Sequence, residues 1–160
     1  MDKPLVIILM GSKGDEGHCQ KIAEAARNLG LETVTRIGSA HKTARHTIQL
    51  IESYEKQNRP RVYITVAGRS NALSGFTDGI VSAPVITCPP PSEAYGGADI
   101  FSSIRMPSGI SAALVLEPSN AALLAAKILG LSNPEILENV RRFQKQQMEK
   151  IIEDDRSLNG

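Results

Sequence analysis

The 160-residue chain contains no tryptophan, and aromatic residues make up only 4% of it. The chain also has no large excess of either charge, because 18 basic and 17 acidic residues leave a formal net charge of +1. A surface that binds nucleic acid needs clustered positive charge, and a single-strand binder adds aromatic side chains on which bases stack. The composition therefore argues against nucleic acid as a partner.

Cysteines are scarce and apolar runs are short. Cys19 and Cys88 have neither the number nor the spacing of a disulfide framework or a metal site. No apolar run approaches the roughly 20 residues that a membrane helix needs. The first residues lack the length and cleavage pattern of a signal peptide. We therefore expect a cytoplasmic protein with no membrane association and no metal.

Short apolar segments alternate with longer segments of helical periodicity along the chain. The apolar segments cover residues 5–10, 31–37, 61–67, 84–87 and 112–116, and the helical ones cover 16–29, 44–57, 98–106, 119–129 and 134–154. Such alternation is typical of parallel β-α-β units. We predict one α/β domain over residues 1–160: a three-layer αβα sandwich with a central parallel sheet, flavodoxin-like or Rossmann-like, plus a long C-terminal helix.

The two helices predicted at the C-terminal end indicate assembly. Residues 119–129 are so rich in Ala and Leu that the helix should be buried on most sides. Residues 134–154 carry an apolar stripe and a highly polar middle section. We predict that this last helix packs on a neighbouring subunit and that the chain forms a homo-oligomer.

The turn at residues 38–43 (Gly-Ser-Ala-His-Lys-Thr) brings together residue types that suit chemistry. It follows a predicted parallel strand, and α/β proteins bind ligands at that edge of the sheet. The ammonium of Lys42 and the free N–H groups of the next helix suit a phosphate. Imidazole readily exchanges a proton near neutral pH. Alternatively, Ser39 or Thr43 caps the helix and His41 is a solvated loop residue.

Two more turns, at residues 11–15 and 68–75, follow neighbouring strands. Because the carboxyl ends of parallel strands meet at one edge, the three turns can line one pocket. Asp15 either caps the following helix or accepts hydrogen bonds from sugar hydroxyls. The third turn either binds a ligand through its glycine-flanked polar residues or is an ordinary surface loop. Neither a GxGxxG pattern nor a Gly-Lys-Ser/Thr phosphate loop is present.

Other polar and rigid segments are less distinctive. The run Pro89–Ser92 either walls the far side of the pocket or forms a stiff turn. His18 and His46 fall on predicted helices, and we expect both at the surface.

The three turns together resemble those of the PurE family of purine biosynthesis. The matching runs are Met10–Asp15, Gly38–Thr43 and Ala67–Leu73, in the same order, and the similarity spans nearly the whole chain. Carboxylases of this family add carbon dioxide directly to C4 of 5-aminoimidazole ribonucleotide (AIR). Mutases of the family instead move a carboxylate from the exocyclic nitrogen to that carbon.

The third turn favours the carboxylase. The mutase pattern is Ala-Gly-Gly-Ala-Ala-His-Leu-Pro-Gly, whereas residues 67–75 read Ala-Gly-Arg-Ser-Asn-Ala-Leu-Ser-Gly, with Ala72 in place of the histidine. Lys42 also replaces an arginine common in mutases, which keeps the charge but loses bidentate geometry. We predict an AIR carboxylase, a carboxy-lyase that converts AIR and CO2 reversibly to 4-carboxy-AIR (CAIR). The alternatives are a mutase and a non-catalytic nucleotide-binding module.

The resemblance also implies roles for residues. His41 is expected to move the C4 proton as general acid and base, Asp15 to hold the ribose hydroxyls, and Lys42 to hold the phosphate with neighbouring serines. Residues of the third turn are expected to orient the ring or the new carboxylate. The predicted substrate-binding set is Gly11, Ser12, Asp15, Ser39, Ala40, Lys42, Gly68, Arg69, Ser70 and Asn71. Because C4 is electron-rich and enamine-like, no metal, biotin or ATP is expected, and the family commonly assembles as an octamer.

Overall fold

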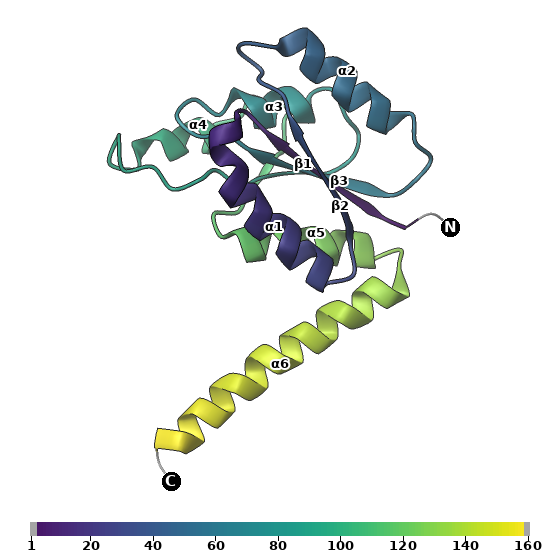
Figure 1. Ribbon diagram of the computed structural model, residues 1–160, viewed down its shortest axis with the longest axis vertical. Coiled ribbons are helices and arrows are strands. Elements are labelled where there is room, and N and C mark those ends of the chain that lie inside the picture. Colours follow the sequence, from purple (N-terminus) through teal and green to yellow (C-terminus); the bar gives the residue numbers. More distant parts are fainter. Residues whose placement is uncertain (1–2, 159–160) are drawn as a thin grey trace.

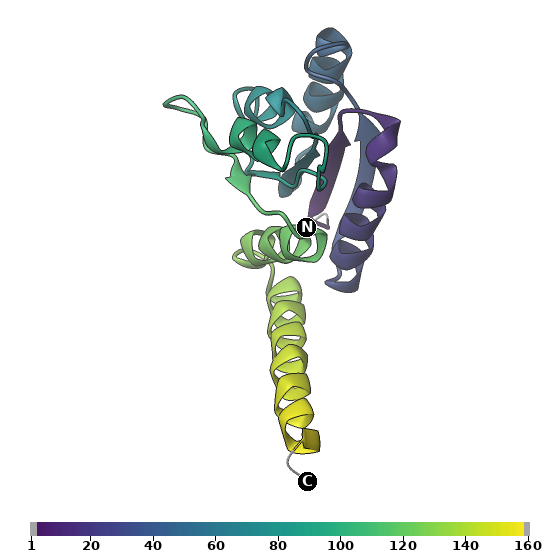
Figure 2. The same ribbon diagram turned by 90° about the vertical axis from the view of Figure 1, so that its left-hand side faces the viewer.

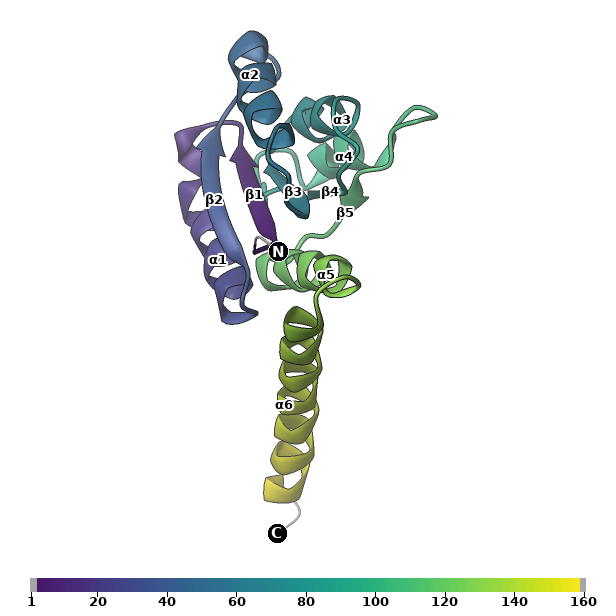
Figure 3. The ribbon, with the colours of Figure 1, turned by 90° about the vertical axis from the view of Figure 1, so that its right-hand side faces the viewer.

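A computed structural model describes residues 3–158 and shows the predicted α/β architecture. Five parallel strands form one sheet in the order β2-β1-β3-β4-β5, as Figure 3 shows. The strands are β1 (Leu5–Met10), β2 (Glu32–Ile37), β3 (Arg61–Val66), β4 (Val85–Thr87) and β5 (Ala113–Leu114). The fold prediction is confirmed, while the predicted domain limits of 1–160 extend beyond the described residues at both ends.

Helices cover both faces of the sheet (Figure 1). Those that pack beside the sheet are α1 (Glu16–Asn28), α2 (Ala44–Glu55), α3 (Ala72–Asp78) and α5 (Pro118–Gly130). Val6 and Ile8 of β1 are buried with α1 and α5, whereas Ile7 and Leu9 are buried with α2 and α3. Because β1 is covered on both sides, its unbroken apolar run reads as a central parallel strand.

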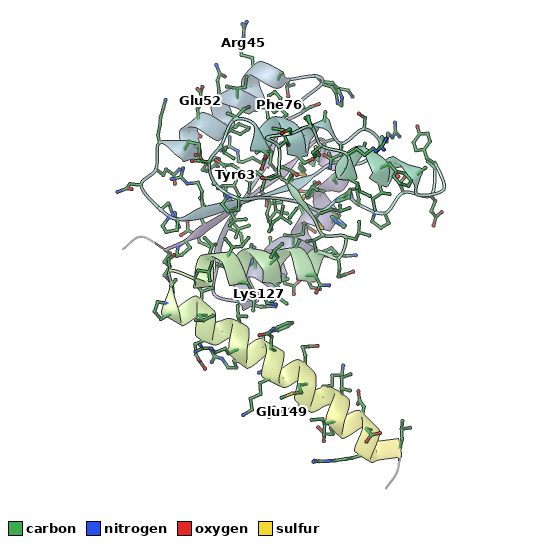
Figure 4. All side chains as sticks on the ribbon, turned by 180° about the vertical axis from the view of Figure 1, so that it is seen from behind. Arg45, Glu52, Tyr63, Phe76, Lys127 and Glu149 are labelled. Atoms are coloured by element: carbon green, nitrogen blue, oxygen red, sulfur yellow. The ribbon has the colours of Figure 1, made fainter. Side chains whose placement is uncertain are left out.

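Strand β3 lies next to β1 and shares this burial. Tyr63 of β3 is fully buried, and Figure 4 shows it on the sheet between α3 and α5. Its hydroxyl donates to Oε1 of Glu55 at 2.8 Å. Arg45, by contrast, projects from α2 away from the sheet (Figure 4). This central pair of strands is the rigid base from which the first and third turns emerge.

Strand β5 is shorter than the predicted segment of residues 112–116. Within residues 3–158 it pairs only with β4, itself three residues long, and the register joins Ile86 to Ala113 and Thr87 to Leu114. The length of an edge strand is limited by its neighbour, a property that its own sequence does not contain. Between β4 and β5 the chain forms a 3-10 helix, η2 (Ala98–Ile100), followed by α4 (Phe101–Ile104).

Helix α6 (Pro134–Leu158) runs four residues past its predicted end and projects away from the sheet (Figure 2). Its first turns are anchored, because Ile136 and Val140 are buried in the core that α1 and α5 share. Farther along, Met148 and Ile151 are 58% and 68% exposed. Packing of this helix on a neighbouring subunit stays a prediction. No helix within residues 3–158 is both long enough and apolar enough to span a membrane.

Candidate active site

A pocket of about 630 Å³ opens where β1, β2, β3 and β4 reach their carboxyl ends. This volume is ordinary for a small-molecule site. All three turns contribute to it, together with the proline segment after β4. Its lining residues are Gly11, Ser12, Gly14, Asp15, Ser39, Ala40, His41, Lys42, Ala67, Gly68, Arg69, Ser70, Leu73, Pro90, Pro91 and Ser92. Every residue of the predicted site except Asn71 therefore lines one pocket.

In the first turn, two predicted site residues contact each other. The Ser12 hydroxyl donates to Oδ2 of Asp15 at 3.2 Å. Asp15 stands at the N-cap position of α1, but its carboxylate forms no capping bond. The structure therefore does not use Asp15 as a helix cap, and the carboxylate faces the pocket with lone pairs to spare.

The histidine turn is held in shape by its own hydroxyl groups. The N–H of Ser39 donates to Oγ1 of Thr43 at 2.9 Å, and the N–H of Lys42 donates to Oγ of Ser39 at 3.2 Å. Beneath the turn, the buried hydroxyl of Thr47 donates to the Thr43 carbonyl at 3.0 Å. The side chains of His41 and Lys42 take no part in these bonds, are exposed, and line the pocket.

The third turn presents Arg69 and Ser70 to the pocket, and both residues are exposed. Arg69 has a φ of +60°, a left-handed conformation that is unusual for a residue with a Cβ. Its N–H donates to Oδ2 of Asp99 at 3.0 Å. No local sequence signal connects this turn with Asp99, which lies 30 residues farther along the chain.

Asn71 departs from the prediction. Its side chain is 3% exposed and does not line the pocket. Its amide donates to Oγ1 of Thr87 at 2.6 Å and to Oγ of Ser103 at 2.9 Å, while its oxygen caps α3 by accepting from the N–H of Ser74 at 3.3 Å. The expected contact of Asn71 with the ring or carboxylate is therefore corrected to a structural one. An asparagine just before a helix is itself an N-cap signal that could have indicated this.

The proline segment lines the pocket, as one of the two interpretations of Pro89–Ser92 expected. His18, which contacts Cys88 just before this segment, is half-buried, whereas we expected it at the surface. Its Nε2 lies 3.4 Å from Sγ of Cys88. Burial is the main cause that lowers the pKa of His18, and burial likewise raises the pKa of the Cys88 thiol to about 12. His46 is exposed, as expected.

The chemistry available to the pocket is proton transfer and anion binding. An imidazole, an ammonium, a guanidinium, a carboxylate and several hydroxyls converge there. Over residues 3–158, no group of three or more His, Cys, Asp and Glu side chains is arranged to hold a metal ion. The arrangement therefore suits a small anionic substrate that gains or loses a proton.

Comparison with known proteins gives a consistent result. The chain is 58% identical to the phosphoribosylaminoimidazole carboxylase of Treponema denticola over 156 residues, which is 98% of each chain. It is 50% identical to the Archaeoglobus fulgidus protein of the same name, over 95% of this chain and 83% of that one. The crystal structure of Treponema denticola PurE superposes with a TM-score of 0.97 at 57% identity, covering 99% of this chain and 100% of that one.

A family model described as AIR carboxylase matches residues 5–150. The matched region holds all three turns of the pocket and ends within α6. The chain belongs to the AIR carboxylase family.

Proposed function

We propose that the chain is an AIR carboxylase of purine biosynthesis, which adds CO2 to C4 of AIR and reverses the reaction by decarboxylating CAIR. The observation that carries the proposal is the gathering of His41, Lys42, Asp15 and Arg69 in one pocket of a chain from this family. These are the groups that the substrate needs: a proton carrier, two cations for its anionic parts, and an acceptor for its ribose hydroxyls.

The ribose phosphate fits best at the first and second turns. The Ser39 oxygen already accepts from the N–H of Lys42, so its own proton is available to a phosphate oxygen. The Lys42 ammonium supplies positive charge beside it. Ser12 directs its proton at Asp15 and must rotate to reach the phosphate. Asp15 then turns its lone pairs to the ribose hydroxyls.

The reaction itself needs one proton carrier. C4 of AIR is enamine-like, and its electron pair forms the new bond to the carbon of CO2. The adduct carries both a hydrogen and a carboxylate at C4. The imidazole of His41 removes that hydrogen as a proton, and the C–H electron pair restores the aromatic ring. In the reverse direction the imidazolium returns the proton to C4, and CO2 leaves. Arg69 and Ser70 contact the new carboxylate, and no cofactor is required.

The third turn supports direct carboxylation over the mutase reaction. Ala72, which stands where the mutase pattern has histidine, is the first residue of α3 and does not line the pocket. Among the described residues, His41 is the one histidine that lines it. One imidazole suffices for a reaction in which a single proton leaves C4.

The test supplies purified protein with AIR and bicarbonate and follows CAIR formation. Formation of CAIR supports the proposal. Consumption of N-carboxylated AIR with no CAIR formed from AIR and bicarbonate overturns it in favour of the mutase.

Exchanging the imidazole tests the role of His41. In His41→Asn, turnover should fall by about 10²–10⁴, the usual contribution of a positioned general acid and base, while AIR still binds. His46→Asn is the matched control, because His46 is exposed on α2 and does not line the pocket. Turnover retained by His41→Asn would refute the assignment, and AIR binding without turnover in the wild type would indicate a binding module.

The proposal extends to assembly. Helix α6 exposes Met148, Ile151 and Ile152 on the part that projects from the body. Burying these side chains against a neighbouring copy would stabilise a homo-oligomer, for which the octamer typical of the family is the expected size. We expect the enzyme to act in the cytoplasm on a small-molecule substrate.

A further inference from the structure

The backbone conformation of Arg69 is unusual, and nothing in the neighbouring sequence accounts for it. Its φ of +60° is the only positive φ on a non-glycine residue within residues 3–158. In this conformation the Cβ crowds the following carbonyl oxygen, so an arginine adopts it only when its surroundings hold it there. The residue is exposed, and side-chain packing is therefore not what holds it.

The surroundings that hold Arg69 come from η2 and α4. The N–H of Arg69 donates to Oδ2 of Asp99 at 3.0 Å, and bonds to a charged acceptor are the stronger kind. Ser102 adds a second tie: its hydroxyl donates to the Asp99 carbonyl at 2.7 Å and accepts from the N–H of Asn71 at 3.0 Å. The backbone on both sides of Ser70 is thus tied to one short segment.

Asp99 acts on the turn without entering the pocket. It is not a lining residue. A Cβ placed on Gly68 would lie 3.8 Å from Oδ2 of Asp99 and 3.6 Å from Cγ of Pro90, so the carboxylate lies close to the backbone of the turn, on its proline side. The Arg69 guanidinium forms no ion pair within the described stretch of the chain. The carboxylate therefore binds the backbone of Arg69 and leaves its side chain for an anionic ligand.

We infer that Asp99 is a positioning residue for the carboxylation of AIR. It holds the Arg69 N–H, keeps this residue in the left-handed conformation, and so directs the Arg69 and Ser70 side chains at the pocket. The inference rests on the proposed function for the identity of the substrate, and on the geometry alone for the bond between Asp99 and Arg69.

The kinetic test compares two replacements of Asp99. Asp99→Ala removes the acceptor and should lower kcat/KM for AIR about tenfold. Asp99→Asn keeps a side-chain oxygen that accepts the Arg69 N–H and should stay within about threefold of wild type. Asp78→Ala is the matched control, because Asp78 also accepts a loop N–H, from Ser111 at 2.8 Å, but lies outside this pocket. It should leave kcat/KM unchanged.

A second replacement tests whether Asp99 acts through the Arg69 backbone. Glycine adopts a φ of +60° without strain, so Arg69→Gly removes the need for Asp99 along with the guanidinium. In this background, Asp99→Ala should change kcat/KM less than about twofold. The same tenfold loss in both backgrounds would show that Asp99 does not act through Arg69 and would overturn the inference.

Proteolysis gives a readout that does not depend on activity. Trypsin cleaves after arginine, so the rate of cutting between Arg69 and Ser70 reports how firmly the turn is held. Asp99→Ala should raise this rate at least about fivefold, while cleavage after the exposed Lys56 of the same chain stays unchanged and shows that the fold persists. If Asp99→Ala does not fold, Asp99→Ser, whose shorter side chain withdraws the acceptor, replaces it.

The outcomes separate this inference from the proposed function. A wild-type chain that makes no CAIR refutes the proposed function, and cleavage after Arg69 still tests the bond to Asp99. A wild-type chain that makes CAIR, with Asp99→Ala matching it in both kcat/KM and cleavage, supports the function and overturns the inference.

Discussion

The most demanding packing in the site lies beneath the histidine turn, at Gly38. A Cβ on this residue would lie 2.8 Å from Oγ1, 3.1 Å from Cγ2 and 3.3 Å from Cβ of Thr47. Thr47 is fully buried, sits in a helix and is β-branched, so it has little freedom to turn aside. Gly38→Ala therefore forces the turn away from α2, or α2 away from the sheet.

The magnitude follows from two opposing terms. Forcing an extra methyl into a packed site costs about 1–3 kcal/mol. Replacing glycine where φ is not left-handed returns about 0.4–1 kcal/mol, because the unfolded chain loses freedom. We expect Gly38→Ala to lower the free energy of unfolding by about 1–2 kcal/mol. Since His41 lies three residues farther along, kcat/KM for AIR should fall about tenfold as well, which is about 1.4 kcal/mol.

Shortening the Thr47 side chain should remove the loss of stability that Gly38→Ala causes. Thr47→Ala deletes both atoms nearest the new methyl, at the cost of hydrogen bonds worth about 1 kcal/mol. Cβ of residue 47 remains 3.3 Å from the new methyl, and this tight contact offsets the gain from the unfolded chain. Gly38→Ala should therefore change stability little when added to Thr47→Ala, which gives a coupling of about 1–2 kcal/mol between the two sites. Urea titrations of the four proteins at one fixed protein concentration measure this cycle, and CAIR formation measures the recovery of the turn.

Two results would refute this reasoning. One is a Gly38→Ala protein as stable as the wild type. The other is a cycle in which the two substitutions are additive, because strict additivity means that the new methyl does not meet Thr47.

Two further predictions concern other parts of the molecule. The pKa of His18 is lowered on folding, so the unfolded chain binds its proton at a higher pH. The free energy of unfolding should therefore fall as the pH drops below about 6.5 and level off below the lowered pKa. In urea titrations across pH, His18→Gln should lose this part of the pH dependence. If the variant keeps the wild-type pH dependence, another group causes it. If α6 forms the proposed subunit interface, Ile151→Asp should dissociate the proposed homo-oligomer without unfolding the subunit, because Ile151 is 68% exposed in the single subunit. Light scattering measures the mass and circular dichroism the helix, and an unchanged mass would place the interface elsewhere.

Much of the fold could be predicted because its signals are local. The run 5–10 is apolar at every position and too short for a helix, which identifies a strand covered on both faces. Gly30, directly after the predicted helix of residues 16–29, has a φ of +82°, the left-handed conformation in which helices commonly end. The parallel direction of the strands then predicts the location of the site. It brings the turns at residues 11–15, 38–43 and 68–75 to one edge of the sheet, and each of them lines the pocket.

The predictions that did not hold involve contacts between distant residues. Asn71 was expected in the pocket, but Thr87 and Ser103 draw its amide into the interior. His18 was expected at the surface, but Cys88, 70 residues away in sequence, lies beside its ring. The local sequence suggested one role for each of these side chains, but contacts with distant residues give each a different one.

The amino-acid sequence by itself therefore determined the succession of strands and helices, and through it which turns share an edge. These depend on periodicity and on the single direction of parallel strands. Only the tertiary structure decided where individual side chains point, such as the carboxylate of Asp99 toward the backbone of Arg69. Such contacts form when segments far apart in the chain pack together, because a hydrogen bond depends on distances that sequence spacing does not contain.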